Sequence, residues 1–227
     1  MVIGHWLLNK KANVQFYQSR FPIPYSLFPI PLLNMTQIFG EFNDDLPVVQ
    51  EYLTLVFSPS SIPVKQRWRT NGLSADFMAD YFATFFPGKE GATGEDDIQA
   101  EVKSAVSFIG NELLENAMKF TDETSQYPIS LTLQMHSDRL VFRATNCVNP
   151  KELAEFQAYI QELTTSDPDD LYIRHLEENA DDDSEPVSRL GILTMMNDYQ
   201  AKLGWKFETI QNESEAIAVT IMVQLTL

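Results

Sequence analysis

The residues best suited to chemistry are three polar side chains in the segment NELLENAMKF, at positions 111–120. Glu112, Asn116 and Lys119 are spaced at i, i+4 and i+7, which places them on one stripe of a helix. In such a row a carboxylate can accept a proton from a hydroxyl, an amide oxygen can coordinate Mg²⁺, and an ammonium can pair with a phosphate. The same spacing is also typical of a solvated helix edge with a Glu–Lys pair, and spacing alone favours that interpretation.

The helix expected to position these side chains has the clearest periodicity in the sequence. Between residues 98 and 120, apolar side chains recur at steps of three and four, as in an amphipathic helix. Alternating segments at 129–135 and 140–144 then predict two strands joined by a turn. Because proline is tolerated in a first helical turn, Pro150 indicates the start of another helix, over 151–163.

The order of the predicted elements indicates the fold class. The last part of the chain predicts a helix over 188–202 and strands over 205–209 and 216–225. Two hairpin-like strand pairs separated by helices are typical of an α+β fold, with helices on one face of a mixed, mostly antiparallel sheet. The same order disfavours a doubly wound parallel sheet, in which single strands alternate with helices.

Residues 35–97 form a block that precedes this core. Within it, 36–42 predicts a short strand and 73–86 a helix, whereas 48–57 fits either type of element. The first 34 residues contain no Asp or Glu, and four prolines interrupt their second half. We hypothesise that they are a leader and that the folded body starts at Met35. The alternative is a disordered arm that packs on a partner.

Charge and cysteine content restrict the partners and the compartment. The 227 residues include 16 Lys and Arg against 32 Asp and Glu, a formal net charge of −16. This acidity repels nucleic-acid phosphates and anionic membranes, so both are disfavoured as partners. The single cysteine, Cys147, cannot form an intrachain disulfide, which predicts a reducing, cytoplasmic compartment. Nine of the acids lie within 166–187, a density that favours a solvated loop.

The segment ELLENAMKF, at positions 112–120, resembles the N-box of the GHKL superfamily of ATP-binding proteins. The resemblance implies that Glu112 is a general base, that Asn116 coordinates Mg²⁺ and that Lys119 meets a phosphate of ATP. It also implies a two-layer α/β sandwich over 98–227, with the acidic segment 166–187 as the nucleotide lid. A carboxylate at position 112 resembles the ATPase and serine-kinase branches more than the histidine kinases.

Two further motifs of that superfamily have counterparts in the expected order. Asn146 stands where its members have an Asp that accepts the amino group of adenine, and an Asn carbonyl still accepts one hydrogen bond without bringing charge. The segment SRLGIL, at 188–193, is similar to a Gly-x-Gly-Leu pattern in which Arg189 replaces the first glycine. The resemblance implies that Gly191 lets backbone approach a phosphate at a helix start and that Arg189 pairs with phosphate or fills the space.

The whole of 35–227 resembles cyanobacterial regulators related to the SiaB-type kinases, which are GHKL proteins of partner-switching pathways. This resemblance implies a cytoplasmic signalling regulator that binds Mg-ATP and a small STAS-like antagonist protein. It would phosphorylate that partner as an anti-sigma-type serine/threonine kinase or sequester it, and a homodimer stays open. The competing hypothesis is a nucleotide-independent pseudo-kinase that acts as a protein-binding module. The altered Asp and Gly motifs favour the pseudo-kinase, whereas the intact pair of Glu112 and Asn116 favours nucleotide binding.

Overall fold

The computed structural model describes residues 36–58, 70–88, 98–181, 189–210 and 216–227. The chain divides into two units, Met1–Pro31 and Leu32–Leu227, and the first lies wholly outside the described residues. The leader expected over 1–34 and the start expected at Met35 therefore fall outside the structure described below. None of the helices in the described ranges combines the length and hydropathy that a membrane span requires.

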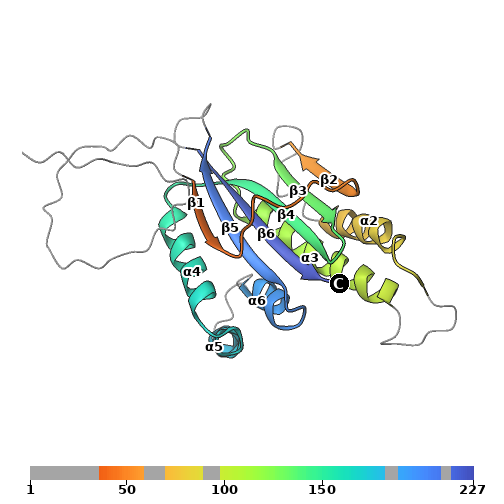
Figure 1. Ribbon diagram of the computed structural model, residues 1–227. Coiled ribbons are helices and arrows are strands. Elements are labelled where there is room, and N and C mark those ends of the chain that lie inside the picture. Colours follow the sequence, from red (N-terminus) through yellow and green to blue (C-terminus); the bar gives the residue numbers. More distant parts are fainter. Residues whose placement is uncertain (1–35, 59–69, 89–97, 182–188, 211–215) are drawn as a thin grey trace, which may run out of the picture. The chain divides into compact units, whose positions relative to one another are not determined.

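A six-stranded sheet forms one layer of the molecule (Figure 1). Its strand order is β1-β5-β6-β4-β3-β2, and each of these five pairings is antiparallel. The α+β prediction is thus confirmed, and the described sheet is antiparallel throughout instead of mixed. The strands are β1 (Gln37–Gly40), β2 (Tyr52–Phe57), β3 (Ile129–Met135), β4 (Arg139–Val148), β5 (Lys202–Thr209) and β6 (Ile217–Thr226).

The helices lie on one face of this sheet (Figure 1). Strand residues alternate between the two faces, so that Leu133, Phe142 and Val223 lie side by side in register and are fully buried in the main core. The long helix α3 packs on β3 and β4, and its apolar stripe completes that core. The helices are α2 (Asn71–Ala83), α3 (Ile98–Lys119), α4 (Leu153–Thr165), α5 (Pro168–Asp181) and α6 (Arg189–Asn197).

The two edge strands both come from the block at 35–97, and residues 41–51 connect them across the face opposite the helices (Figure 1). A glycine in β5 permits the close approach of this crossover. A Cβ on Gly204 would lie 2.2 Å from the backbone nitrogen of Phe42. The block therefore belongs to the same sheet as the rest of the described chain.

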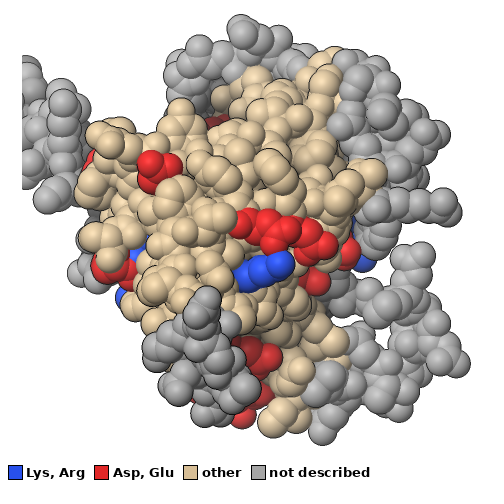
Figure 2. Space-filling view, turned by 90° about the vertical axis from the view of Figure 1, so that its right-hand side faces the viewer, with Lys and Arg blue, Asp and Glu red and all other residues tan. Residues whose placement is uncertain are grey.

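Helix α2 packs on α3 through buried residues that include Met78 and Phe82. Its opposite side exposes Leu73, Phe77 and Tyr81, which recur every fourth residue and so form one stripe. Figure 2 shows that side of the molecule, where a short row of acidic side chains and an adjacent basic one lie on a surface that is otherwise largely uncharged. Apolar surface of this kind is typical of sites where another protein docks.

The secondary structure of the acidic segment 166–187 differs from the prediction. Residues 168–181 form α5, whereas the sequence favoured a solvated loop. The Asp167 carboxylate accepts hydrogen bonds from the backbone N–H groups of Asp169 and Asp170, and acidic residues stabilise a helix N-terminus. Leu171 and His175, one turn apart, are buried. Residues 182–187, the last part of the expected lid, lie outside the described residues.

Candidate functional site

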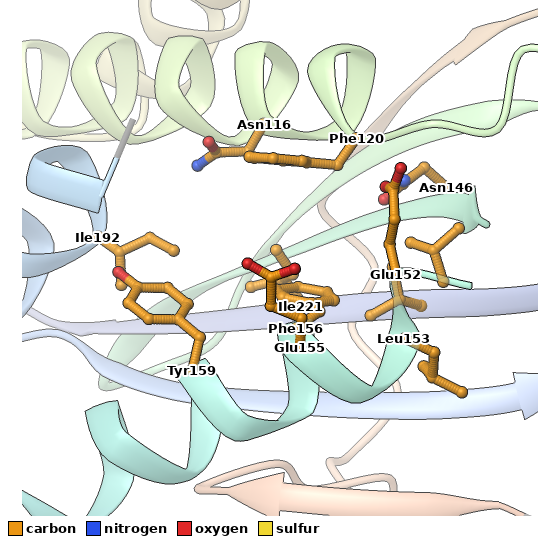
Figure 3. Close-up of a pocket in the computed structure, with 12 residues that line it drawn as sticks. Asn116, Phe120, Asn146, Glu152, Leu153, Glu155, Phe156, Tyr159, Ile192 and Ile221 are labelled. Carbon is orange, nitrogen blue, oxygen red and sulfur yellow. The ribbon is translucent and has the colours of Figure 1, made fainter. Parts of the chain in front are cut away.

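A cavity of about 280 Å³ lies between α3, α4 and α6, above strands β4 and β6 (Figure 3). Its walls are mainly apolar, with a few polar side chains that project into it. This composition is typical of small-molecule sites, which usually measure roughly 300–1,000 Å³. The lining residues are Asn116, Phe120, Asn146, Val148, Glu152, Leu153, Glu155, Phe156, Tyr159, Ile192, Val219 and Ile221.

Two site residues predicted from separate motifs meet in this cavity. Asn116 comes from α3 and Asn146 from β4, and only 4% and 3% of their surfaces are exposed. The Nδ2 atom of Asn116 is buried and has no hydrogen-bond partner in the part of the chain that the structure describes. The Nδ2 atom of Asn146 is 3.4 Å from the Cys147 carbonyl oxygen, which is long for a hydrogen bond. Both amides can therefore offer hydrogen bonds to a ligand.

A second contact brings Glu112 of α3 against the first turn of α6. A Cβ on Gly191 would lie 1.8 Å from Oε2 of Glu112, so glycine leaves the space that this carboxylate occupies. Burial raises the pKa of Glu112, and the nearby charge of Glu115 raises it further. Among the described residues, no hydrogen bond to the Glu112 carboxylate offsets this effect. A half-buried carboxyl with a raised pKa has the properties of a general base.

The two predicted cationic residues lie differently. Lys119 is exposed at the end of α3, and its Nζ lies 5.6 Å from the ring centroid of Phe120, which lines the cavity. Its ammonium is therefore at the rim of the site and not within it. Arg189 begins α6, but its side chain lies outside the described part of the structure.

Sequence reasoning missed the contribution of α4 to the cavity. Glu152, at the N-cap of α4, and Glu155, Phe156 and Tyr159 within the helix all line it, and Figure 3 shows their side chains rising from one side of that helix. The available signal was that Glu155 and Phe156 lie three and four residues after Glu152, and that Tyr159 lies three residues after Phe156, which predicts a shared face. That spacing does not indicate that this face borders a cavity, because the cavity depends on how α4 packs against α3.

The resemblance to the N-box implies that residues at this cavity bind Mg²⁺ and a nucleotide. Within the described ranges, no group of three or more His, Cys, Asp and Glu side chains is arranged to hold a metal ion. Mg²⁺ commonly takes only one or two protein oxygens and completes its shell with water and substrate phosphates, so Asn116 suits that role. The unpartnered buried amide of Asn116 and the apolar cavity beside it also fit a nucleotide.

Comparison with known proteins adds no family assignment. No protein-family model matches this chain, and no curated protein matches it either. The likeness to GHKL proteins therefore rests on the motifs of the sequence.

Proposed function

We propose that this protein is a cytoplasmic signalling regulator that binds Mg-ATP in the cavity between α3, α4 and α6 and acts on a protein partner. One observation carries the proposal. The buried Nδ2 group of Asn116 has no hydrogen-bond partner among the described residues, and it shares the cavity with the buried amide of Asn146. Because an unpaired buried donor costs free energy, its presence favours a bound ligand that pairs with it.

Each residue of the candidate site has a separate role in this proposal. Asn116 holds Mg-ATP through its amide, and Lys119 at the rim faces the phosphates. ATP would supply the phosphoryl group. Glu112 takes the proton from a serine or threonine hydroxyl of the partner, a role supported by its raised pKa. Arg189 and Gly191 are assigned to the phosphates at the start of α6, because the backbone N–H groups of a helix N-terminus favour anions.

The partner is a small STAS-like antagonist protein, which is phosphorylated or sequestered. The exposed stripe of α2 supports a function that involves another protein. Leu73 and Phe77 are 73% and 57% exposed, although both are large apolar side chains. Burying such side chains against a partner would contribute favourable free energy at about 25 cal/mol per Å² of apolar surface.

The second candidate is a protein-binding module that needs no nucleotide. It is favoured by the charges around the cavity, where Glu152 and Glu155 project carboxylates. No Lys or Arg is among the lining residues in the described ranges. Two carboxylates without a nearby cation repel the phosphates of ATP, so the choice depends on how far the phosphates lie from α4.

Titration calorimetry with Mg-ATP distinguishes the two candidates. The wild-type chain should bind Mg-ATP, and Asn116→Ala should abolish that binding. Asn111→Ala is the matched control, because Asn111 lies on the same helix outside the cavity and donates to Glu115 at 3.0 Å. Equal affinity in the wild type and Asn116→Ala would contradict the assignment of the site. Absence of binding by the wild type would favour the nucleotide-independent module.

A further inference from the structure

We propose that two copies of this chain associate through the free edge of β2 and the exposed stripe of α2, so that their two sheets continue into one another across a two-fold axis. This inference goes beyond the proposed function, because the association requires no nucleotide. None of the described residues that line the cavity belongs to β2 or α2. The stripe of α2 therefore holds a second copy, and the antagonist of the proposed function binds near the cavity.

The main chain of β2 has a free edge on the side away from β3. The register of the two strands places Glu51 opposite Met135, and the N–H of Met135 donates to the Glu51 carbonyl at 3.0 Å. Because hydrogen-bonded positions alternate along an antiparallel pair, the main-chain groups of Tyr52, Thr54 and Val56 point away from β3. Within the described ranges β2 pairs with β3 alone, so these groups are available to another strand.

This edge lacks the features that protect natural edge strands from further pairing. Its six residues, YLTLVF, include no charged residue and no proline, and such an edge is a template for a second strand. The opposite edge of the sheet differs, because β1 has only four residues and ends at Gly40, whose φ of 63° takes the chain out of the extended conformation. Association is therefore expected at β2 and not at β1.

A second copy fits the β2 edge in one register. Because facing residues of an antiparallel pair point to the same face of the sheet, a two-fold axis must meet β2 at a residue and not between two residues. An axis at Thr54 lets all three residues with free main-chain groups pair. Thr54 then faces its own copy, and Tyr52 faces Val56 of the second copy. Pairs of two threonines, and of an aromatic with a β-branched residue, both stabilise antiparallel strands.

The stripe of α2 extends the same interface on the helix side of the sheet. Half-buried residues of β2 pack against the core cluster that contains Met78 of α2, and Figure 1 shows that helix beside β2. Leu73, Phe77 and Tyr81 lie on the side of α2 that faces away from α3. An antiparallel second copy of the stripe places Leu73 against Tyr81, with Phe77 at the centre. The stripe is thus self-complementary in the same way as β2.

The acidic residues beside the stripe are paired within their own copy. Ser107 donates to Asp76 at 2.6 Å, and the ammonium of Lys103 lies 2.5 Å from the Asp80 carboxylate. Both partners belong to α3, so these carboxylates are turned toward α3 and away from the stripe. The net charge of −16 makes two copies repel one another over the rest of their surface. The largely uncharged side shown in Figure 2 is where they can approach.

The exposed apolar area is sufficient for a specific dimer. The side chains of Tyr52, Phe77 and Tyr81 are 58%, 57% and 39% exposed. At about 150–250 Å² for each aromatic side chain, they would bury about 600 Å² over the two copies. A specific interface buries at least about 1,000 Å² in total, and Leu73, Val56 and the main chain of the edge supply the remainder.

Sedimentation velocity of the full chain, without nucleotide, tests the dimer. Val56→Lys should raise the dimer dissociation constant at least about tenfold, because a lysine on an edge strand opposes pairing. Ile38→Lys is the matched control, since it adds the same charge at an exposed position of the other edge. Phe77→Ser should weaken the dimer by a similar factor, whereas Ile173→Ser, at an exposed position of α5, should not. Added salt should strengthen the dimer by screening the repulsion between the acidic copies.

Amide hydrogen exchange locates the interface at single residues. The N–H of Thr54 should gain protection as the protein concentration rises, whereas that of Leu55, directed at β3, should be protected throughout. A wild-type chain that stays monomeric at high micromolar concentration overturns the proposal and leaves the β2 edge to a strand of another protein. A dimer that Val56→Lys and Ile38→Lys weaken equally, or that forms without protection of Thr54, overturns the assigned interface. Binding of Mg-ATP by a monomer would leave the proposed function standing.

Discussion

Polar side chains on the two faces of the sheet differ in their hydrogen bonding. On the face crossed by residues 41–51, the side chains of Gln224 and Arg143 are paired within the protein, although Nε2 of His136 beside the crossover is buried without a partner among the described residues. Gln224 donates to the Glu41 carbonyl at 2.9 Å and accepts from Arg139 at 3.0 Å. Arg143 donates to Gln134 and to the Asn43 carbonyl. On the helix face, by contrast, Asn116 lines a cavity, and its buried Nδ2 group has no partner within the described ranges.

We interpret the paired side chains of Gln224 and Arg143 as groups that stabilise the fold, and the unpaired amide group of Asn116 as a group that binds a ligand. A paired buried group contributes about 0.5–1.5 kcal/mol to stability, whereas an unpaired one costs about 1–3 kcal/mol. Substitutions on the crossover face should therefore lower stability and leave ligand affinity unchanged. Substitutions in the cavity should lower ligand affinity and leave stability nearly unchanged.

The largest expected effect is on the crossover face, at Gly204. In Gly204→Ala the new Cβ meets the backbone of Phe42 at 2.2 Å, which only a movement of the crossover relieves. Overpacking of this kind costs about 1–3 kcal/mol or more, and urea denaturation should show that loss. Gly72→Ala is the control, because its Cβ meets nothing closer than 3.9 Å and alanine favours a helix. Equal stability of the two variants would show that the crossover does not press on β5.

The second-largest effect is expected in the stability difference between Gln224→Ala and Asn116→Ala. Gln224→Ala leaves the Glu41 carbonyl without its partner and should lower the free energy of unfolding by about 1–3 kcal/mol. Asn116→Ala removes a donor that was already unpaired, so its change in stability should be much smaller. Urea denaturation of both variants measures the contrast. A larger loss of stability in Asn116→Ala would contradict our distinction between the faces.

A smaller effect is expected where α3 meets α6. Gly191→Ala places a Cβ 1.8 Å from the Glu112 carboxylate, but this side-chain end can rotate away. The expected loss of stability is about 1 kcal/mol, and it should disappear in a Glu112→Ala background because the two positions are coupled. A double-mutant cycle measured by urea denaturation tests this. Additive losses would mean that the two residues do not compete for the same space.

The smallest effect concerns the pH dependence of stability. Burial raises the pKa of Glu112 above its usual 4.5, so the folded state binds more protons than the unfolded state between 4.5 and that raised value. Stability therefore falls as pH rises through this window. Glu112→Gln lacks the penalty and should be the more stable protein at neutral pH. Thermal unfolding should show the difference shrinking below pH 4.5, and a difference that grows there would contradict the assigned sign.

Much of the fold was predictable because local patterns agree with the packing. The apolar period of 98–120 predicted α3, which spans Ile98–Lys119. Strand β4 was expected to end at Ala144 but continues to Val148, because β6 pairs with it there. That partner lies some 70 residues later in the chain, beyond the reach of a local pattern. Helix α6, expected over 188–202, ends at Asn197.

The site was predictable only in part, for a related physical reason. Motif order indicated that Asn116 and Asn146 share a site, and both line the cavity. The pairing of Phe120 with Phe156 depends on the position of α4 against α3 and has no signature in either segment. The burial of α5 also depends on tertiary packing, which outweighed the charge density of its segment.

The side-chain amide resonances of this protein report directly on which face of the sheet binds Mg-ATP. In an NMR titration with Mg-ATP, we expect large shifts for the amides of Asn116 and Asn146. The amides of Gln134 and Gln224, paired on the opposite face of the sheet, should not move. Saturation by Mg-ATP without any shift at Asn116, or with the main shifts on the crossover face, would contradict it.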